Sequence, residues 1–260
     1  MPIIEFRNLF KTYANQEGEE MNALENINLK VKDGEFVCIL GPSGCGKSTL
    51  LEIAAGLLPP TKGEFLLDGT PRTGTSRDIG VVFQDSSLFP WRNIRKNLEF
   101  GLEIAGVDKG IRAQKVQEAI EMVGLSGFEN KYPHQLSGGM RQRAGLARTL
   151  VNNPSCILMD EPFSAVDHLT RLTLQEEIVR IWQREKKTII FITHDVSEAV
   201  YLATRIVVLT PRPGRIQKLF DVPFPQPRNR NDISFIEIIE KIYMCLNNPE
   251  GKDGKIEYTI

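Results

Sequence analysis

The strongest constraint on the fold of this chain is a glycine-rich stretch at residues 41–49. It reads Gly41-Pro42-Ser43-Gly44-Cys45-Gly46-Lys47-Ser48-Thr49 and fits the pattern Gly-x-x-x-x-Gly-Lys-Ser/Thr. An apolar run of strand length at 35–40 precedes it, and residues 49–55 have the composition of a helix. Because glycines allow several backbone N–H groups to turn toward one anion, this strand–loop–helix unit predicts a phosphate-binding loop.

Side chains of this loop have roles that follow from the charge of a triphosphate. Lys47 is expected to reach the β- and γ-phosphates, and the Ser48 hydroxyl is expected to hold Mg²⁺. Cys45 stands at a helix N-terminus, where the pKa of a thiol tends to fall, so we expect alkylation to inhibit activity and nucleotide to protect. The alternative is a glycine-serine turn that contains a lysine by chance. An accidental match flanked by a strand and a helix is less frequent than an accidental match alone.

Composition limits the classes of function. The chain has 260 residues, 41% hydrophobic and 25% charged, which is ordinary for a soluble globular protein. A net charge of −1 gives no support for nucleic-acid binding. The four cysteines show no Cys-x-x-Cys pairing, so neither a zinc site nor a disulfide framework is expected, and Cys38 and Cys156 are predicted core residues. Without a signal sequence or a run of ~18 apolar residues, the chain is expected to be cytoplasmic.

The order of predicted elements favours an α/β fold with a mostly parallel sheet. Residues 1–40 are predicted to be β-structure, with an exposed hairpin loop at 15–20. Beyond the glycine-rich loop, apolar strands alternate with helical patterns, which indicates a parallel sheet covered by helices on both faces. These strands are predicted at 78–83, 155–160, 188–193 and 205–209.

Three further segments depart from this alternation. Between 86 and 151 the strand pattern is absent and helical periodicity appears at 111–123, which predicts an α-helical insertion. Residues 211–227 hold five prolines, which exclude a central strand but allow an edge strand at 215–220. Residues 233–246 have the apolar spacing of a terminal amphipathic helix.

The other requirements of phosphoryl transfer have candidates at the ends of predicted strands. Asp160 ends an apolar strand and can hold Mg²⁺ through water, and Glu161 after it can polarise the attacking water. Gln84 can ligate the metal or water, and His194 can donate a hydrogen bond to the γ-phosphate. The alternatives are a capped loop for the Asp-Glu-Pro turn and a structural role for the lone histidine.

A second glycine turn, Leu136-Ser137-Gly138-Gly139, leads into a predicted helix at 140–151. Its free N–H groups and serine hydroxyl suit a γ-phosphate, although an ordinary N-capped helix would give the same pattern. Two phosphate-binding turns in separate subdomains make sense if two chains pair head to tail. Tyr13 precedes the loop at 15–20, where its ring could stack on adenine or could be an ordinary strand residue.

Taken together, these motifs resemble the nucleotide-binding subunits of ATP-binding cassette (ABC) transporters over about residues 1–220. Walker A (41–49), the Q-loop at Gln84, the signature 136–139, Walker B (156–161), the D-loop Ser164-Ala165-Val166-Asp167 and the switch His194 follow in the family's order. Val166 stands where the family more often has Leu. The resemblance implies an ABC ATPase domain over 1–227, with a helical subdomain at about 86–151, an antiparallel N-terminal β-subdomain and a C-terminal helical extension over 228–260.

The resemblance also implies partners. Two ATP molecules would be sandwiched in a dimer, expected to be of identical subunits, each between Walker A of one subunit and Ser137, Gly138, Gly139 and Asp167 of the other, with Mg²⁺ bound and Tyr13 on adenine. The segments 87–94, 97–102 and 211–216 are similar to bacterial importers for nitrate, sulfonates, taurine and related small solutes. This similarity implies separate permease subunits, a solute-binding protein and a place at the cytoplasmic face of the membrane.

Two points stay open at this stage. The cluster Phe89-Pro90-Trp91 would lie at the permease-docking groove, or it would belong to the core of the helical subdomain. A soluble cassette ATPase of cofactor assembly, translation or DNA repair is the alternative function. The chain has neither the tandem cassettes of translation factors nor the coiled-coil insertions of repair proteins, and a P-loop kinase or GTPase would leave the signature turn unexplained.

Overall fold

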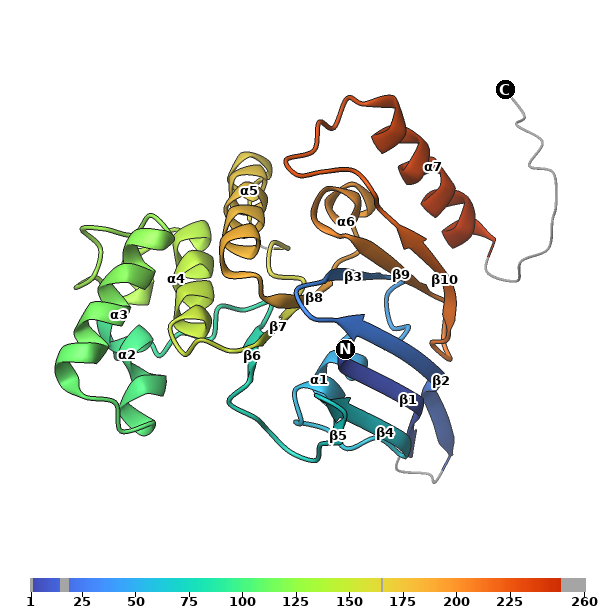
Figure 1. Ribbon diagram of the computed structural model, residues 1–260, viewed down its shortest axis with the longest axis horizontal. Coiled ribbons are helices and arrows are strands. Elements are labelled where there is room, and N and C mark those ends of the chain that lie inside the picture. The colour runs from blue at the N-terminus through green and yellow to red at the C-terminus, as the bar shows by residue number, and fades with distance from the viewer. Residues whose placement is uncertain (1, 15–18, 165, 249–260) are drawn as a thin grey trace.

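The computed structural model describes residues 2–14, 19–164 and 166–248, and these residues form two β-sheets and two groups of helices (Figure 1). Most of the hairpin loop expected at 15–20 lies outside the described residues, and so does Ala165 of the D-loop. None of the helices in the described ranges combines the length and apolar composition that a membrane span needs.

The larger sheet has six strands and is parallel except at one edge. Its central strands β3 and β8 are buried at every position, as expected for strands covered on both faces. The edge strand β10 pairs antiparallel with β9, which fits the expected edge strand within the proline-rich segment. The strand order is β10 (Ile216–Asp221), β9 (Arg205–Leu209), β3 (Phe36–Leu40), β8 (Thr188–Ile192), β7 (Cys156–Asp160) and β6 (Ile79–Val82).

The smaller sheet is antiparallel and contains the N-terminus. In β2, buried and exposed residues alternate from Ile27 to Lys32, because one face of this sheet packs on the core and the other meets solvent. The turn at Asp33-Gly34 carries the chain from β2 to β3, and therefore from one sheet to the other. The order is β2 (Glu20–Lys32), β1 (Pro2–Ala14), β4 (Lys62–Leu67) and β5 (Thr70–Pro71).

The two faces of the six-stranded sheet are covered differently. Helices α5 (His168–Glu185), α6 (Val196–Leu202) and α7 (Ile233–Asn247) pack on one face. Helix α1 (Lys47–Ala54) packs on the other, together with the antiparallel sheet. Helices therefore lie on both faces, as expected, and the antiparallel sheet shares the second face with α1. Cys38 and Cys156 are fully buried, which confirms their prediction as core residues.

A separate group of helices occupies the left of Figure 1 and has a hydrophobic core of its own. It comprises α2 (Ile94–Ile104), α3 (Lys109–Met122), the 3-10 turn η1 (Pro133–Gln135) and α4 (Gly138–Leu150). Asn93, Asp108 and Ser137 cap the three α-helices through their side chains. These helices connect β6 to β7, so the insertion leaves the parallel pairing of those strands intact.

Helix α7 shares the main core. Its apolar stripe places Phe235, Ile238 and Ile242 in the same buried cluster as α5, α6 and the six-stranded sheet. The division of the chain at residues 227 and 228 stays a prediction.

Candidate nucleotide-binding site

The glycine-rich loop lies between β3 and α1 and is shaped by close backbone contacts. Gly46 has φ of 100°, and a Cβ atom there would lie 2.7 Å from the Leu24 side chain and 2.9 Å from the Ala23 carbonyl oxygen, so only glycine fits. Lys47 is buried, and its Nζ donates hydrogen bonds to the carbonyl oxygens of Gly41 at 2.8 Å and Pro42 at 3.1 Å. The loop therefore holds a lysine cation above its own backbone, beside the N-terminus of α1.

The carboxylate at the end of β7 faces this lysine. Burial raises the pKa of Asp160 above its usual value, and the charge of Glu161 adds to this, although a hydrogen bond from the Ser48 hydroxyl and the charge of Lys47 act in the opposite direction. A half-buried carboxylate and a hydroxyl in contact are oxygen donors of the kind that Mg²⁺ prefers. A divalent cation there would also favour the charged form of Asp160, so the residues present fit this metal.

Glu161 and His194 come from neighbouring strands and contact each other. The imidazole Nδ1 and the carboxylate Oε2 are hydrogen-bonded at 3.0 Å. The backbone N–H of Glu161 donates to the Ile192 carbonyl oxygen at 3.0 Å, which ties the loop after β7 to the end of β8. Glu161 has φ of 41°, a left-handed conformation that is uncommon for this residue type. The imidazole is exposed to solvent, so this pair can face a ligand.

The predicted base-stacking residue lies at the same cavity. A cavity of about 250 Å³ is lined by Tyr13, Met21, residues 43–49 in part, Glu161 and Arg212. The Tyr13 hydroxyl and Thr49 Oγ1 are 3.4 Å apart, which places the ring beside the first turn of α1. The structure thus brings together the glycine-rich loop, the ring of Tyr13 and the carboxylate of Glu161.

Arg212 is a cavity residue that the sequence analysis did not assign to the site. Its Nε donates to the Gly44 carbonyl oxygen at 3.1 Å, and its guanidinium also contacts the Met21 sulfur at 2.8 Å. The turn that carries it is fixed by Gly214, whose N–H donates to Ala23 and whose carbonyl accepts from Glu25. The segment 211–216 contributed only to the family resemblance. It is also the sequence signal that could have indicated a turn crossing the glycine-rich loop.

Other predicted site residues lie outside this cavity. Ser137 accepts a hydrogen bond from the Met140 N–H at 3.3 Å and caps α4, while Asp167 accepts from the Thr170 N–H at 3.1 Å and caps α5. A Cβ atom on Gly139 would lie 2.5 Å from the Thr170 methyl group, so these two helix N-termini are in contact. Gly138 opens α4 beside them. They form a second group, and none of them lines the cavity of their own chain.

Gln84 stands two residues beyond the end of β6 and is exposed. The sequence predicts that Gln84 follows directly after its strand, whereas one residue separates it from the end of β6. Its assignment to the metal or to the attacking water stays a prediction.

The expected lowering of the pKa of the Cys45 thiol is wrong. Its side chain is buried, with 1% of its surface exposed, and burial raises the pKa of the thiol. The charge of Lys47 and backbone hydrogen bonds act in the opposite direction but are weaker. A Cβ atom on Gly41 would lie 2.8 Å from the sulfur, so the thiol packs beneath the loop instead of facing the nucleotide. Only the backbone of Cys45 is available to a phosphate.

Comparisons with known proteins agree with this geometry. A family model described as ABC transporter matches residues 24–164. An uncharacterized ABC transporter ATP-binding protein of Methanocaldococcus jannaschii is 52% identical, with 92% of this chain and 89% of that protein covered. The aliphatic sulfonates import ATP-binding protein SsuB of Bacillus cereus is 45% identical (89% and 91% covered), and the taurine import ATP-binding protein TauB of Pelagibacter ubique is 43% identical (95% and 97% covered).

Solved structures show the same class of fold. An ATP-binding cassette solved as a dimer in a post-hydrolysis state, bound to ADP and Pi, superposes with a TM-score of 0.76 at 34% identity. The superposition covers 85% of this chain and 100% of that cassette. The chain belongs to the ABC transporter family and is an ATP-binding, ATP-hydrolysing subunit of it. The ABC ATPase fold expected from the motifs is confirmed.

Proposed function

We propose that this ATPase powers the import of a small solute of the nitrate, sulfonate or taurine kind through separate permease subunits. The observation that carries the proposal is a cavity lined by Lys47 and Glu161, with Asp160 beside Ser48 and His194 on Glu161, while a second phosphate-binding turn lies elsewhere in the chain. The names of the sulfonate and taurine relatives support the class of solute.

The residues in and beside the cavity divide the work of hydrolysis. Lys47 exchanges its carbonyl partners for phosphate oxygens, which are stronger acceptors. Ser48, Asp160 and Gln84 would hold Mg²⁺, which neutralises charge on the phosphates when bound. Glu161 accepts a proton from the attacking water, and His194 holds the carboxylate in place and faces the γ-phosphate. Tyr13 stacks on adenine, and Arg212 places a positive charge beside the nucleotide.

A second copy of the chain would complete the site. Ser137, Gly138, Gly139 and Asp167 form one surface at the N-termini of α4 and α5, and they do not line the cavity of their own chain. Helix N-termini bind anions because their N–H groups are free and their dipole is positive. A head-to-tail dimer would place this surface on the γ-phosphate of the partner's ATP, and the dimeric ADP-bound cassette supports such pairing.

A groove beside the helical group is the proposed permease contact. Its volume is about 730 Å³, and its apolar lining includes Phe89, Phe100 and Leu102. Phe89 packs edge-on against Phe100 with ring centroids 4.7 Å apart, whereas Trp91 is 72% exposed. Buried Asn97 fixes this loop by accepting from the Phe89 N–H at 2.7 Å. Phe89 is therefore half-buried between other rings, while exposed Trp91, with its ring centroid 5.5 Å from that of Phe89, can enter an interface. Binding there would hold the chain at the cytoplasmic face of the membrane.

Co-purification from detergent-solubilised membranes tests the proposal. We expect the tagged wild-type chain to retain a multi-spanning permease, and Trp91→Ala to lose it while keeping ATP binding. Tyr243→Ala removes an aromatic side chain of α7 that is 50% exposed and serves as the control. Recovery of soluble partners only would support the alternative, a soluble cassette ATPase of cofactor assembly or repair.

A further inference from the structure

A row of buried polar side chains connects residue 230 to the turn that carries His194. The Arg230 guanidinium donates to Gln175 Oε1 at 2.6 Å, and Gln175 Nε2 donates to Glu198 Oε1 at 2.8 Å. The Glu198 carboxylate also accepts a hydrogen bond from the Thr193 hydroxyl. Gln175, Glu198 and Thr193 are each at least 95% buried, so each must be hydrogen-bonded to avoid a large desolvation penalty.

At one end, this row fixes the backbone on both sides of His194. Thr193 Oγ1 accepts a hydrogen bond from the Asp195 N–H at 3.0 Å, which leaves its own proton for Glu198. Asp195 Oδ1 in turn accepts from the Glu198 N–H at 3.0 Å. Residues 193 and 195 are therefore both held by Glu198, and His194 between them is held against Glu161 at 3.0 Å.

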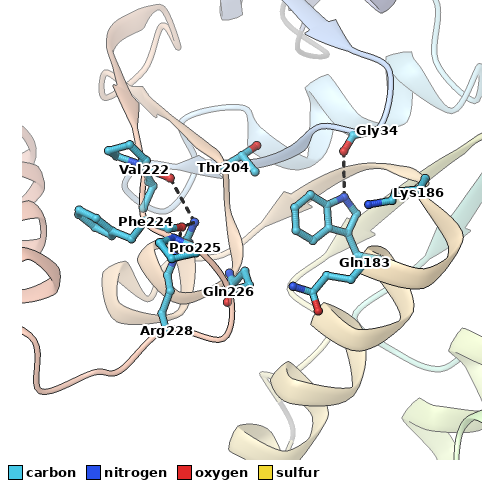
Figure 2. A pocket seen from close by; sticks show the side chains of 11 residues that line it. Gly34, Gln183, Lys186, Thr204, Val222, Phe224, Pro225, Gln226 and Arg228 are labelled. Atoms are coloured by element: carbon cyan, nitrogen blue, oxygen red, sulfur yellow. Dashed lines mark hydrogen bonds between the residues drawn. The ribbon is translucent and has the colours of Figure 1, made fainter.

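At the other end, two arginines attach the segment after residue 227 to α6, the helix that follows the His194 turn. The Arg230 guanidinium lies 3.8 Å from the centroid of the Tyr201 ring, close enough for a cation–π contact. Arg228 is buried beside a pocket of about 510 Å³ and donates to the Val222 carbonyl oxygen at 3.2 Å (Figure 2). It also donates to carbonyls at the end of α6, those of Val200, Tyr201 and Ala203.

Glu198 has no direct cationic partner within the described ranges; its hydrogen-bond donors are the neutral side chains of Gln175 and Thr193. Gln175 is an amide, so it can accept from Arg230 with its oxygen and donate to Glu198 with its nitrogen at the same time. It thus links the arginine of one segment to the carboxylate of another. Hydrogen bonds in such a row polarise one another, so loss of one is felt along the whole row.

We propose that Arg230, Gln175 and Glu198 are positioning residues for His194, so that the segment after residue 227 sets the rate of ATP hydrolysis. The rate consequence rests on the proposed roles of Glu161 and His194. The positional consequence does not, because it concerns the turn at 193–195 alone. Helix α7 of this segment fills the core with apolar side chains, whereas Arg230 contacts a polar row that reaches the backbone beside His194.

Histidine NMR tests the positional consequence without nucleotide. The sequence has three histidines, His134, His168 and His194, so the imidazole spectrum is simple, and His194→Gln identifies one signal. Arg230→Met keeps an apolar stem on Tyr201 and removes the donor to Gln175. We expect the His194 signals to shift and the other two to stay in place. Unmoved His194 signals in a folded Arg230→Met chain would overturn the proposal.

Steady-state hydrolysis tests the rate consequence. For Arg230→Met we expect kcat to fall about ten-fold with KM for ATP within two-fold, since small displacements of catalytic groups lower rates steeply. Arg230→Lys should recover part of the rate and serves if the Met variant is unstable. Arg180→Met, on the exposed side of α5, is the matched control and should behave as wild type. Lower thermal stability with unchanged kcat and unchanged His194 signals would show that the row only stabilises the fold, and would overturn the proposal. A wild-type chain that forms a dimer but does not hydrolyse ATP would instead refute the proposed function.

Discussion

Gly214→Ala tests whether the turn between β9 and β10 is part of the nucleotide site. A Cβ atom at this position would lie 2.1 Å from the carbonyl oxygen of Cys45, in the phosphate-binding loop. Ordinary contact begins at 3.4 Å, so the turn must move by about 1.3 Å, the difference between these two distances. The neighbour is a backbone atom, so it cannot rotate aside as the end of a flexible side chain could.

The cost of this displacement can be estimated from the contacts that it breaks. Two backbone hydrogen bonds of 2.9 Å join Gly214 to Ala23 and Glu25. Losing both would lower the free energy of unfolding by about 1–3 kcal/mol. The hydrogen bond of Arg212 to Gly44, 3.1 Å long, would break with them and remove the guanidinium from the cavity. If a charged contact to ATP is worth about 1.5–3 kcal/mol, affinity falls roughly ten- to hundred-fold.

Isothermal titration with ATP and thermal denaturation measure the two effects separately. Arg212→Ala should reproduce the loss of affinity with little loss of stability, because Arg212 is exposed. Gly110→Ala is the control, because it places a methyl group at an exposed helix position where the nearest atom would be a carboxylate oxygen of the N-cap Asp108, 3.1 Å away. Wild-type affinity in Gly214→Ala would refute the role of this turn.

Three further predictions concern single side chains. Glu161→Gln should bind ATP and accumulate a dimer on gel filtration, because the amide cannot accept the proton from water; full hydrolysis would remove Glu161 from its role. Thiol reagents at neutral pH should label half-buried Cys245 but not Cys45 of the folded chain, as burial raises the pKa of Cys45; mass spectrometry showing rapid labelling of Cys45 would contradict this. The hydrogen bond from Arg7, with help from Lys30, lowers the pKa of Glu5 to about 2, so the stability it contributes is complete above pH 4.5 and is lost as the pH falls toward 2. Glu5→Gln should therefore flatten the acid side of the stability profile, and an unchanged profile would be evidence against this ion pair.

Residues at strand ends could be predicted from the sequence because their position follows from topology. Parallel strands end at the same edge of a sheet, so Lys47 after β3, Asp160 at the end of β7 and His194 after β8 had to lie near one another. Helix caps such as Ser137 are equally local. Only a few residues of chain are needed to specify them.

Features that depend on distant crossings could not be predicted. The Arg212 turn reaches the phosphate-binding loop only because β10 folds back antiparallel to β9, and the sequence pattern does not show where that turn lands. The pKa of Cys45 was misjudged for a similar reason: a helix N-terminus lowers it, but burial beneath Gly41 raises it more. Covering of the second face of the sheet by β-strands is likewise a tertiary property.

Complementation between two inactive variants tests most directly whether the site is shared between two chains. Lys47→Ala removes the lysine of the phosphate-binding loop, and Ser137→Glu places a negative charge at the signature turn. Each alone should abolish hydrolysis. Random pairing in an equal mixture makes about half of the dimers mixed, each with one complete site of two, so about a quarter of the wild-type rate should return. A mixture as inactive as its components would show that each chain builds its site alone and would contradict the account.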